Sequence, residues 1–131
     1  MNNIMFHVRA AAERGEANSQ FNLGVFYDNG LDDNGHAARR NRREAIKWLR
    51  KAAQQGLTRA QCKLAEIYAE ESAPDQAYAW FFVAGENSDG GNGRSAQAGL
   101  KRMAARLSPE QIDRATRRAR GWAARIAKHP L

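Results

Sequence analysis

The side chains best suited to acid–base chemistry are three glutamates that lie close together in the chain, Glu66, Glu70 and Glu71. Two carboxylates can act as general acid and general base when burial separates their pKa values. Nothing in the surrounding sequence predicts burial, so an ordinary solvated helix face explains these glutamates better. We therefore predict no catalytic residues among them.

The histidines and the glycine-rich run do not form a recognisable catalytic or metal-binding pattern. His7 falls where a later copy of the same pattern carries tryptophan, so we expect a packed side chain. His36 and His129 have no carboxylate pattern or HExxH-like spacing nearby. The run GENSDGGNG, residues 85–93, lacks the preceding strand and the following Lys-Ser/Thr of a phosphate loop, so it reads as a flexible linker. We predict no metal, no cofactor and no enzymatic activity.

Cys62 is the only cysteine in the chain, which excludes an internal disulfide and a cysteine-based zinc site. It falls inside a helical pattern, where we expect a small buried hydrophobe, and a lone thiol fits a reducing compartment. The first residues lack a basic segment followed by an apolar one, and no apolar run is long enough to cross a membrane. The sequence as given therefore predicts a cytoplasmic location.

Positive charge is concentrated towards the end of the chain. The formal net charge is +7, and residues 94–128 hold ten Lys or Arg against only two acidic residues. One side of the last predicted helix carries four of these arginines, Arg114, Arg117, Arg118 and Arg125. This stripe is either a polar outer face or a site for anions such as nucleic acid, although no aromatic residues are interleaved for base stacking.

The chain is built from an internal repeat of helix pairs. A shift of 41 residues places Gly15 on Gly56 and His7 on Trp48, and a shift of 32 places Trp48 on Trp80. A third copy appears at a shift of 36, and Ala-x-x-Trp recurs at Trp122. Apolar residues recur at helical spacing, and clustered strand formers are absent, so an all-α fold is predicted.

Seven helices are expected from this pattern, over residues 2–14, 16–29, 42–55, 58–70, 73–86, 94–107 and 109–128. Capping boxes are expected at Thr58 and Ser108, and a third helix start at Ser72. Gly15 and Gly56 are expected just past helix ends, where a left-handed backbone costs glycine least. The apolar stripe of the last helix should pack on the preceding helix, on a different side from the arginines.

These residues resemble the Sel-one-like repeat (SLR), a relative of the tetratricopeptide repeat. The family pattern, roughly A-x-x-G-x-A-x-A-Q-x-x-L-G-x-x-Y and then A-x-x-W-x-x-K-A-A-x-x-G, is matched at Ala12, Gly15, Ala17, Gln20, Leu23, Gly24, Tyr27, Ala45, Trp48, Lys51, Ala52, Ala53 and Gly56. A second unit matches at Ala60, Gln61, Leu64, Tyr68, Ala77, Trp80 and Ala84, with Ala65 in place of the usual glycine. The closing LSPEQIDRATRRARGW looks like the tail after the last repeat of many bacterial proteins of this type.

The resemblance implies a short right-handed α-solenoid of antiparallel helix pairs, closed by a capping helix. We expect one domain with a half repeat at 1–14, repeats at 15–56 and 57–86, and a degenerate third unit with the capping helix at 94–131. The half repeat should leave an exposed apolar edge at Ile4, Met5 and Val8, where a homodimer could form.

The resemblance also implies a non-catalytic scaffold that binds another protein, whose identity the sequence does not give. In this family the partner lies on the concave face formed by the first helix of each pair. That face is expected at Asn18, Asn22, Val25, Asn29, Arg59, Lys63, Glu66, Glu70, Arg102 and Arg106. The long loop at 30–41 is a second candidate for specificity, and binding of nucleic acid or another polyanion by the arginine stripe is the alternative function.

Overall fold

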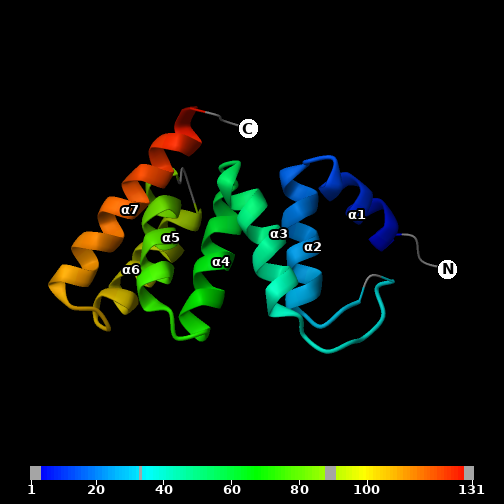
Figure 1. Ribbon diagram of the computed structural model, residues 1–131, viewed down its shortest axis with the longest axis horizontal. Coiled ribbons are helices and arrows are strands. Elements are labelled where there is room, and N and C mark those ends of the chain that lie inside the picture. The colour runs from blue at the N-terminus through cyan, green and yellow to red at the C-terminus, as the bar shows by residue number, and fades with distance from the viewer. Residues whose placement is uncertain (1–3, 33, 88–90, 129–131) are drawn as a thin grey trace.

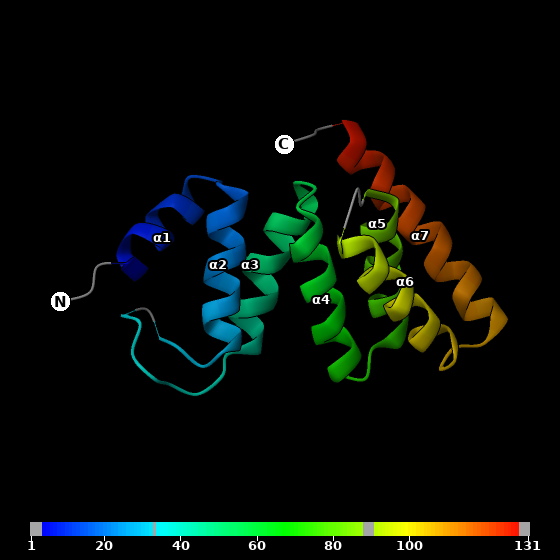
Figure 2. The same ribbon diagram turned by 180° about the vertical axis from the view of Figure 1, so that it is seen from behind.

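The computed structural model describes residues 4–32, 34–87 and 91–128. These residues form seven helices: α1 (Ile4–Glu13), α2 (Ala17–Asp28), α3 (Arg42–Gln54), α4 (Thr58–Glu70), α5 (Pro74–Asn87), α6 (Gly91–Ala104) and α7 (Pro109–Lys128). The helices follow one another along the long axis of the molecule, from α1 at one end to α7 at the other (Figures 1 and 2). Consecutive helices from α1 to α6 pack against each other. The fold is the all-α solenoid of antiparallel helix pairs that the sequence predicts.

The main apolar core runs through the helix pairs, and Cys62, Ala84 and Ala96 form a second, small cluster. Leu23, Leu49 and Leu64 are fully buried, and Trp48 and Trp80 are each only 4% exposed. Small residues next to them let the helices approach closely, and alanines account for much of the remaining core. The repeat therefore supplies both bulky and small apolar residues to the core.

Buried glutamines make the same hydrogen bond in two successive units. Gln20 Nε2 donates to the carbonyl oxygen of Ala12 at 3.2 Å, and 41 residues later Gln61 Nε2 donates to that of Ala53 at 3.0 Å. The carbonyls belong to the last turn of the preceding helix, where no intrahelical donor is available. Each glutamine thus ties the end of one helix to the start of the next.

Gly15 and Gly56 occupy the turns that these glutamines bridge. Their φ angles are 101° and 99°, which an L-residue with a side chain rarely adopts. The backbone N–H of each donates to the alanine three residues before it, at 3.0 Å in both turns. The predicted left-handed position after these helix ends is confirmed.

The predicted helix starts are only partly correct. Ser108 and Gln111 form the expected capping box, with reciprocal bonds of 3.1 and 2.8 Å. Thr58 makes no capping bond, because it is already the first residue of α4 and the capping position before it is Leu57. The Gln61 amide donates to the preceding helix instead. Ser72 has a φ of 60° and lies in the turn after α4, so it does not cap α5. A cap that was not predicted is Asn41, whose Oδ1 accepts from Glu44 N at 3.1 Å.

The helix predicted over 94–107 lies earlier in the structure, over Gly91–Ala104. Glycine and asparagine at its start carry no apolar periodicity, so the pattern hid the first turn. Its end is set by a turn in which Leu107 N donates to Ala104 O at 3.2 Å. The linker predicted across 85–93 is therefore helical at both ends, and residues 88–90 lie outside the described residues.

The exposed apolar edge predicted at Ile4, Met5 and Val8 is wrong at Met5, and the side chain of Ile4 lies outside the described residues. Met5 is 5% exposed and Val8 is half-buried, whereas Phe6 is 70% exposed. A side chain at Gly35 would lie 3.1 Å from Met5, so the 30–41 loop covers this methionine. His7 was expected to be packed, but it is exposed and meets only the edge of Phe6 at a centroid distance of 5.6 Å. The reason is that α1 packs mainly against α2, which leaves the outer side of α1 in solvent.

The 30–41 loop has a defined shape of its own. Ala38 N donates to Gly30 O at 2.7 Å, and Asp32 Oδ1 accepts from the backbone N–H groups of Asn34 and His36 at 2.9 Å each. These two bonds lower the pKa of Asp32 below its ordinary value, and the bond from His36 has the larger effect. The loop is exposed as predicted, but hydrogen bonds order it.

Candidate functional site

The residues predicted to bind a partner lie mostly at exposed positions on or just after α2, α4 and α6. We call the solvent-facing side of α2, α4 and α6 the first-helix face. Val25 and Lys63 are half-buried, and the other eight predicted residues are exposed: Asn18, Asn22, Asn29, Arg59, Glu66, Glu70, Arg102 and Arg106. Asn29 and Arg106 lie just past the ends of their helices.

Direct contacts join the α2 and α4 parts of this face. Arg59 donates a hydrogen bond to Asn18 Oδ1, and its guanidinium lies 4.9 Å from the centroid of the Phe21 ring. On α6, Arg102 lies 5.9 Å from the ring of Phe81, a core residue of α5. The polar positions of α2 and α4 are thus joined into one surface by direct side-chain contacts.

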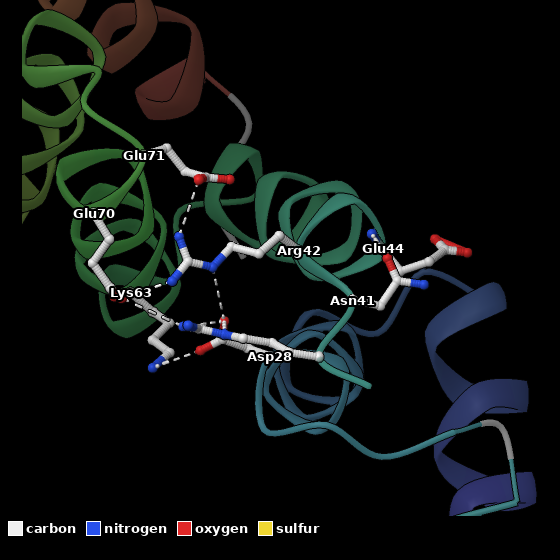
Figure 3. Close-up of polar contacts among 8 residues, drawn as sticks. Asp28, Asn41, Arg42, Glu44, Lys63, Glu70 and Glu71 are labelled. Carbon is white, nitrogen blue, oxygen red and sulfur yellow. Dashed lines mark hydrogen bonds and ion pairs between the residues drawn. The ribbon is translucent and has the colours of Figure 1, made fainter. Parts of the chain in front are cut away.

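The buried carboxylate of Asp28 connects the end of α2 to α4 on this surface (Figure 3). The side chain of Asp28, at the end of α2, is only 3% exposed. Its Oδ1 accepts from Arg40 Nε at 2.8 Å, and its Oδ2 lies 3.2 Å from Lys63 Nζ. One acid therefore joins α2, the end of the 30–41 loop and α4.

Arg42 extends this network to the end of α4. Its Nη2 lies 2.7 Å from Glu70 and its Nη1 lies 3.3 Å from Glu71, so both glutamates bind a guanidinium. Carboxylates that are paired with arginines and partly exposed are not set up as an acid–base couple. Glu70 and Glu71 are exposed, as the sequence predicts, but their ion pairs were not predicted. The burial of Asp28 was not predicted either, because an acid at a helix end gives no sign of burial in the sequence.

A cavity lies between α3, α4, α5 and α7. It measures about 470 Å³. We call it the Arg–Trp cavity, and its lining residues are Arg50, Gln54, Tyr68, Gln76, Trp80, Arg118, Trp122, Arg125 and Ile126. Trp122 stacks on Trp80 with a centroid distance of 4.6 Å and an interplanar angle of 30°, and forms the apolar part of the wall.

This cavity divides the predicted arginine stripe. Arg118 and Arg125 line it, whereas Arg114 and Arg117 do not, and Arg117 is paired with Asp113 at 3.2 Å. All four side chains are exposed. The prediction that the arginines lie on a different side from Trp122 is wrong, because Arg118 and Arg125 are one turn away from it on each side.

α7 also packs differently from the prediction. It lies against α5, not against the preceding helix α6, because Trp122 stacks on Trp80 and buried Ala115 and Ala119 allow a close approach. Its far end reaches the turn between α3 and α4, where a side chain at Gly56 would lie 3.2 Å from Ile126. In both views α7 leans across α5 towards that turn (Figures 1 and 2).

Other chemistry is limited within the part of the chain that the structure describes. No group of three or more His, Cys, Asp or Glu side chains could hold a metal ion there, and none of these helices is long and apolar enough to cross a membrane. Cys62 is buried as predicted, and this burial, followed by the nearby charge of Glu66, raises its pKa to about 11.

Comparison with known families agrees with the internal repeat. The family model described as the Sel1 repeat matches residues 17–57 and again 58–89, more than half of the chain. The chain belongs to the Sel1 repeat family. Sel1 repeat proteins are typically non-catalytic and typically bind other proteins.

A solved structure has the same fold. The chain is similar to c5321, a protective antigen present in uropathogenic Escherichia coli strains whose crystal structure displays an SLR fold. The identity is 29% and the TM-score is 0.81 over 95% of this chain, which spans only 26% of c5321. Among curated protein sequences, none matches this chain.

Proposed function

We propose that this Sel1 repeat domain is a non-catalytic scaffold that binds another protein on the first-helix face. The observation that carries the proposal is that the polar positions of α2 and α4 form one surface, joined by the Arg59–Asn18 hydrogen bond. Asp28 connects the end of α2 to Lys63 on the same surface. A surface that is ordered before binding loses less conformational entropy when the partner arrives.

Added positive charge on this face tests the proposal. Asn22 and Glu66 are exposed on α2 and α4, so Asn22→Arg and Glu66→Arg should leave the fold intact. Proteins bound by the wild-type chain in extracts of its native cell are identified, and one is purified and titrated by calorimetry. We expect both variants to weaken its binding by about tenfold or more, as loss of central interface contacts does.

A matched control carries a charge change outside the face. Arg114→Glu alters an exposed residue of α7 that lines neither the face nor the cavity, and we expect it to bind the partner as the wild type does. A partner that tolerates both face variants but is lost with Arg114→Glu would contradict the proposal. Such a result, together with retention on heparin at low salt, would favour the polyanion alternative instead.

A further inference from the structure

The Arg–Trp cavity lies outside the first-helix face and is not explained by the scaffold function. Its polar wall contains three arginines, Arg50, Arg118 and Arg125, and two glutamine side chains, and no lining residue is acidic. Among the residues that the structure describes, none of these three arginines forms an ion pair with a carboxylate. Three guanidinium groups that converge on one cavity create a positive potential there.

The preceding repeat unit shows what this arrangement lacks. Arg9, 41 residues before Arg50, donates to the hydroxyl of Tyr27 at 2.7 Å and pairs with Glu13 at 3.2 Å. Arg50 likewise donates to the hydroxyl of Tyr68. The position that corresponds to Glu13, however, is Gln54.

Because Gln54 stands where the preceding unit has Glu13, Arg50 lacks the carboxylate partner that Arg9 has. Arg118 and Arg125 then add two further positive charges from α7. An arginine binds a carboxylate through strong, charge-assisted hydrogen bonds, and its planar group suits that geometry. A carboxylate supplied by a partner would therefore meet no competing acid among the lining residues.

The rest of the wall indicates what accompanies that acid. Trp122 and Ile126 present apolar surface beside the arginines, and about 470 Å³ lies within the size range of small-ligand pockets. We propose that the Arg–Trp cavity binds an acidic segment of a partner protein. A carboxylate of this segment meets Arg50, Arg118 and Arg125, and an adjoining apolar side chain packs on Trp122.

Direct titration with defined peptides tests this assignment. The probe is a fluorescein-labelled peptide in which glutamates alternate with leucines, and the matched peptide carries glutamine in place of every glutamate. Fluorescence anisotropy of the full chain at physiological salt is expected to give binding of the glutamate peptide that is at least about tenfold tighter, as loss of charge-assisted hydrogen bonds predicts. Equal affinity for both peptides would overturn the proposal.

Two pairs of variants locate the binding to the cavity. Gln54→Glu restores the internal carboxylate beside Arg50 and is expected to weaken the glutamate peptide by about tenfold. Ala105→Glu makes the same change of charge at an exposed position in the turn after α6, outside both the cavity and the set of residues predicted for the first-helix face, and is expected to have little effect. Equal losses from the two variants would mean that only net charge matters, which would refute a specific site.

The second pair removes one arginine at a time from α7. Arg118→Gln should weaken the peptide, whereas Arg114→Gln, which does not line the cavity, should not. Because all four substituted residues are exposed, folding should be retained, and far-UV circular dichroism and urea unfolding verify it. A short single-stranded DNA that binds more tightly than the glutamate peptide, and is displaced by the same variants, would overturn the proposal in favour of nucleic acid.

Discussion

The helix crossing between α5 and α6 offers a sharp test of the packing. A Cβ atom at Gly99 would lie 2.5 Å from each of three ring carbons of Phe81, which is itself only 1% exposed. Forcing extra atoms into a filled core costs about 1–3 kcal/mol, and this contact belongs at the upper end because the ring has no free space. Alanine at a helix interior regains about 1 kcal/mol relative to glycine. We therefore expect Gly99→Ala to lower the unfolding free energy by about 2 kcal/mol.

Gly121 provides the matched control in α7. A Cβ atom there would meet nothing within 4 Å, and the residue has ordinary helical backbone. Gly121→Ala should therefore raise the unfolding free energy by about 0.5–1 kcal/mol through helix propensity alone. The two variants make the same chemical change in two helices and should move stability in opposite directions.

Urea unfolding followed by circular dichroism measures both effects. For a domain of this size the denaturant slope is about 1–3 kcal/mol per molar urea, so the midpoints of the two variants should differ by about 1–3 M. Phe81→Leu in the Gly99→Ala background should recover part of the loss, because the contact is then relieved. If Gly99→Ala is as stable as Gly121→Ala, the close approach of α6 to Phe81 is wrong.

Three further predictions concern the ion network, the repeat tryptophans and the thiol. Asp28→Asn should lower the unfolding free energy by about 2 kcal/mol, because the buried group loses its charge-assisted bonds to Arg40 and Lys63; a near-neutral effect in urea unfolding would contradict this. Trp48→Ala and Trp80→Ala should each cost about 3–5 kcal/mol in urea unfolding, and near-neutral effects would show that the repeat register is wrong. The pKa of Cys62 is about 11 in the folded state and 9.0 in the unfolded state. The unfolded thiol therefore loses its proton first, and the unfolding free energy should fall as pH rises between these values. Iodoacetamide at pH 8.5 should label the folded thiol far more slowly than the urea-unfolded one, and equal rates would exclude its burial.

Much of the fold could be predicted from the spacing of a few residues. Trp48 and Trp80 fall at corresponding positions, so the helix pairs and their order could be predicted once the shift was found. The start of α6 could not, because Gly91 and its neighbours have no apolar period. The exposure of His7 was missed for a different reason: a repeat position predicts burial only where a neighbouring helix covers it, and α1 packs mainly on α2.

The cavity could be predicted far less well than the helices. Arg50, Trp80 and Arg118 come from three helices and meet only after α7 has folded across α5. In the sequence Arg50 belongs to one basic cluster and Arg118 to another, and nothing connects them. The exchange of Glu13 for Gln54 was visible at a shift of 41, but its meaning depends on the contacts of Arg9, which only the structure provides.

The reach of α7 to the Gly56 turn bears on how the domain unfolds. In a simple solenoid each unit touches only its neighbours, so the ends can open separately and stability is nearly a sum over units. Here Ile126 closes a loop of 70 residues onto the turn between α3 and α4, and loop closure of that length makes folding slower and more cooperative. The helices enclosed by this contact should therefore open as one unit, and any ligand held between α3 and α7 would stabilise all of them together.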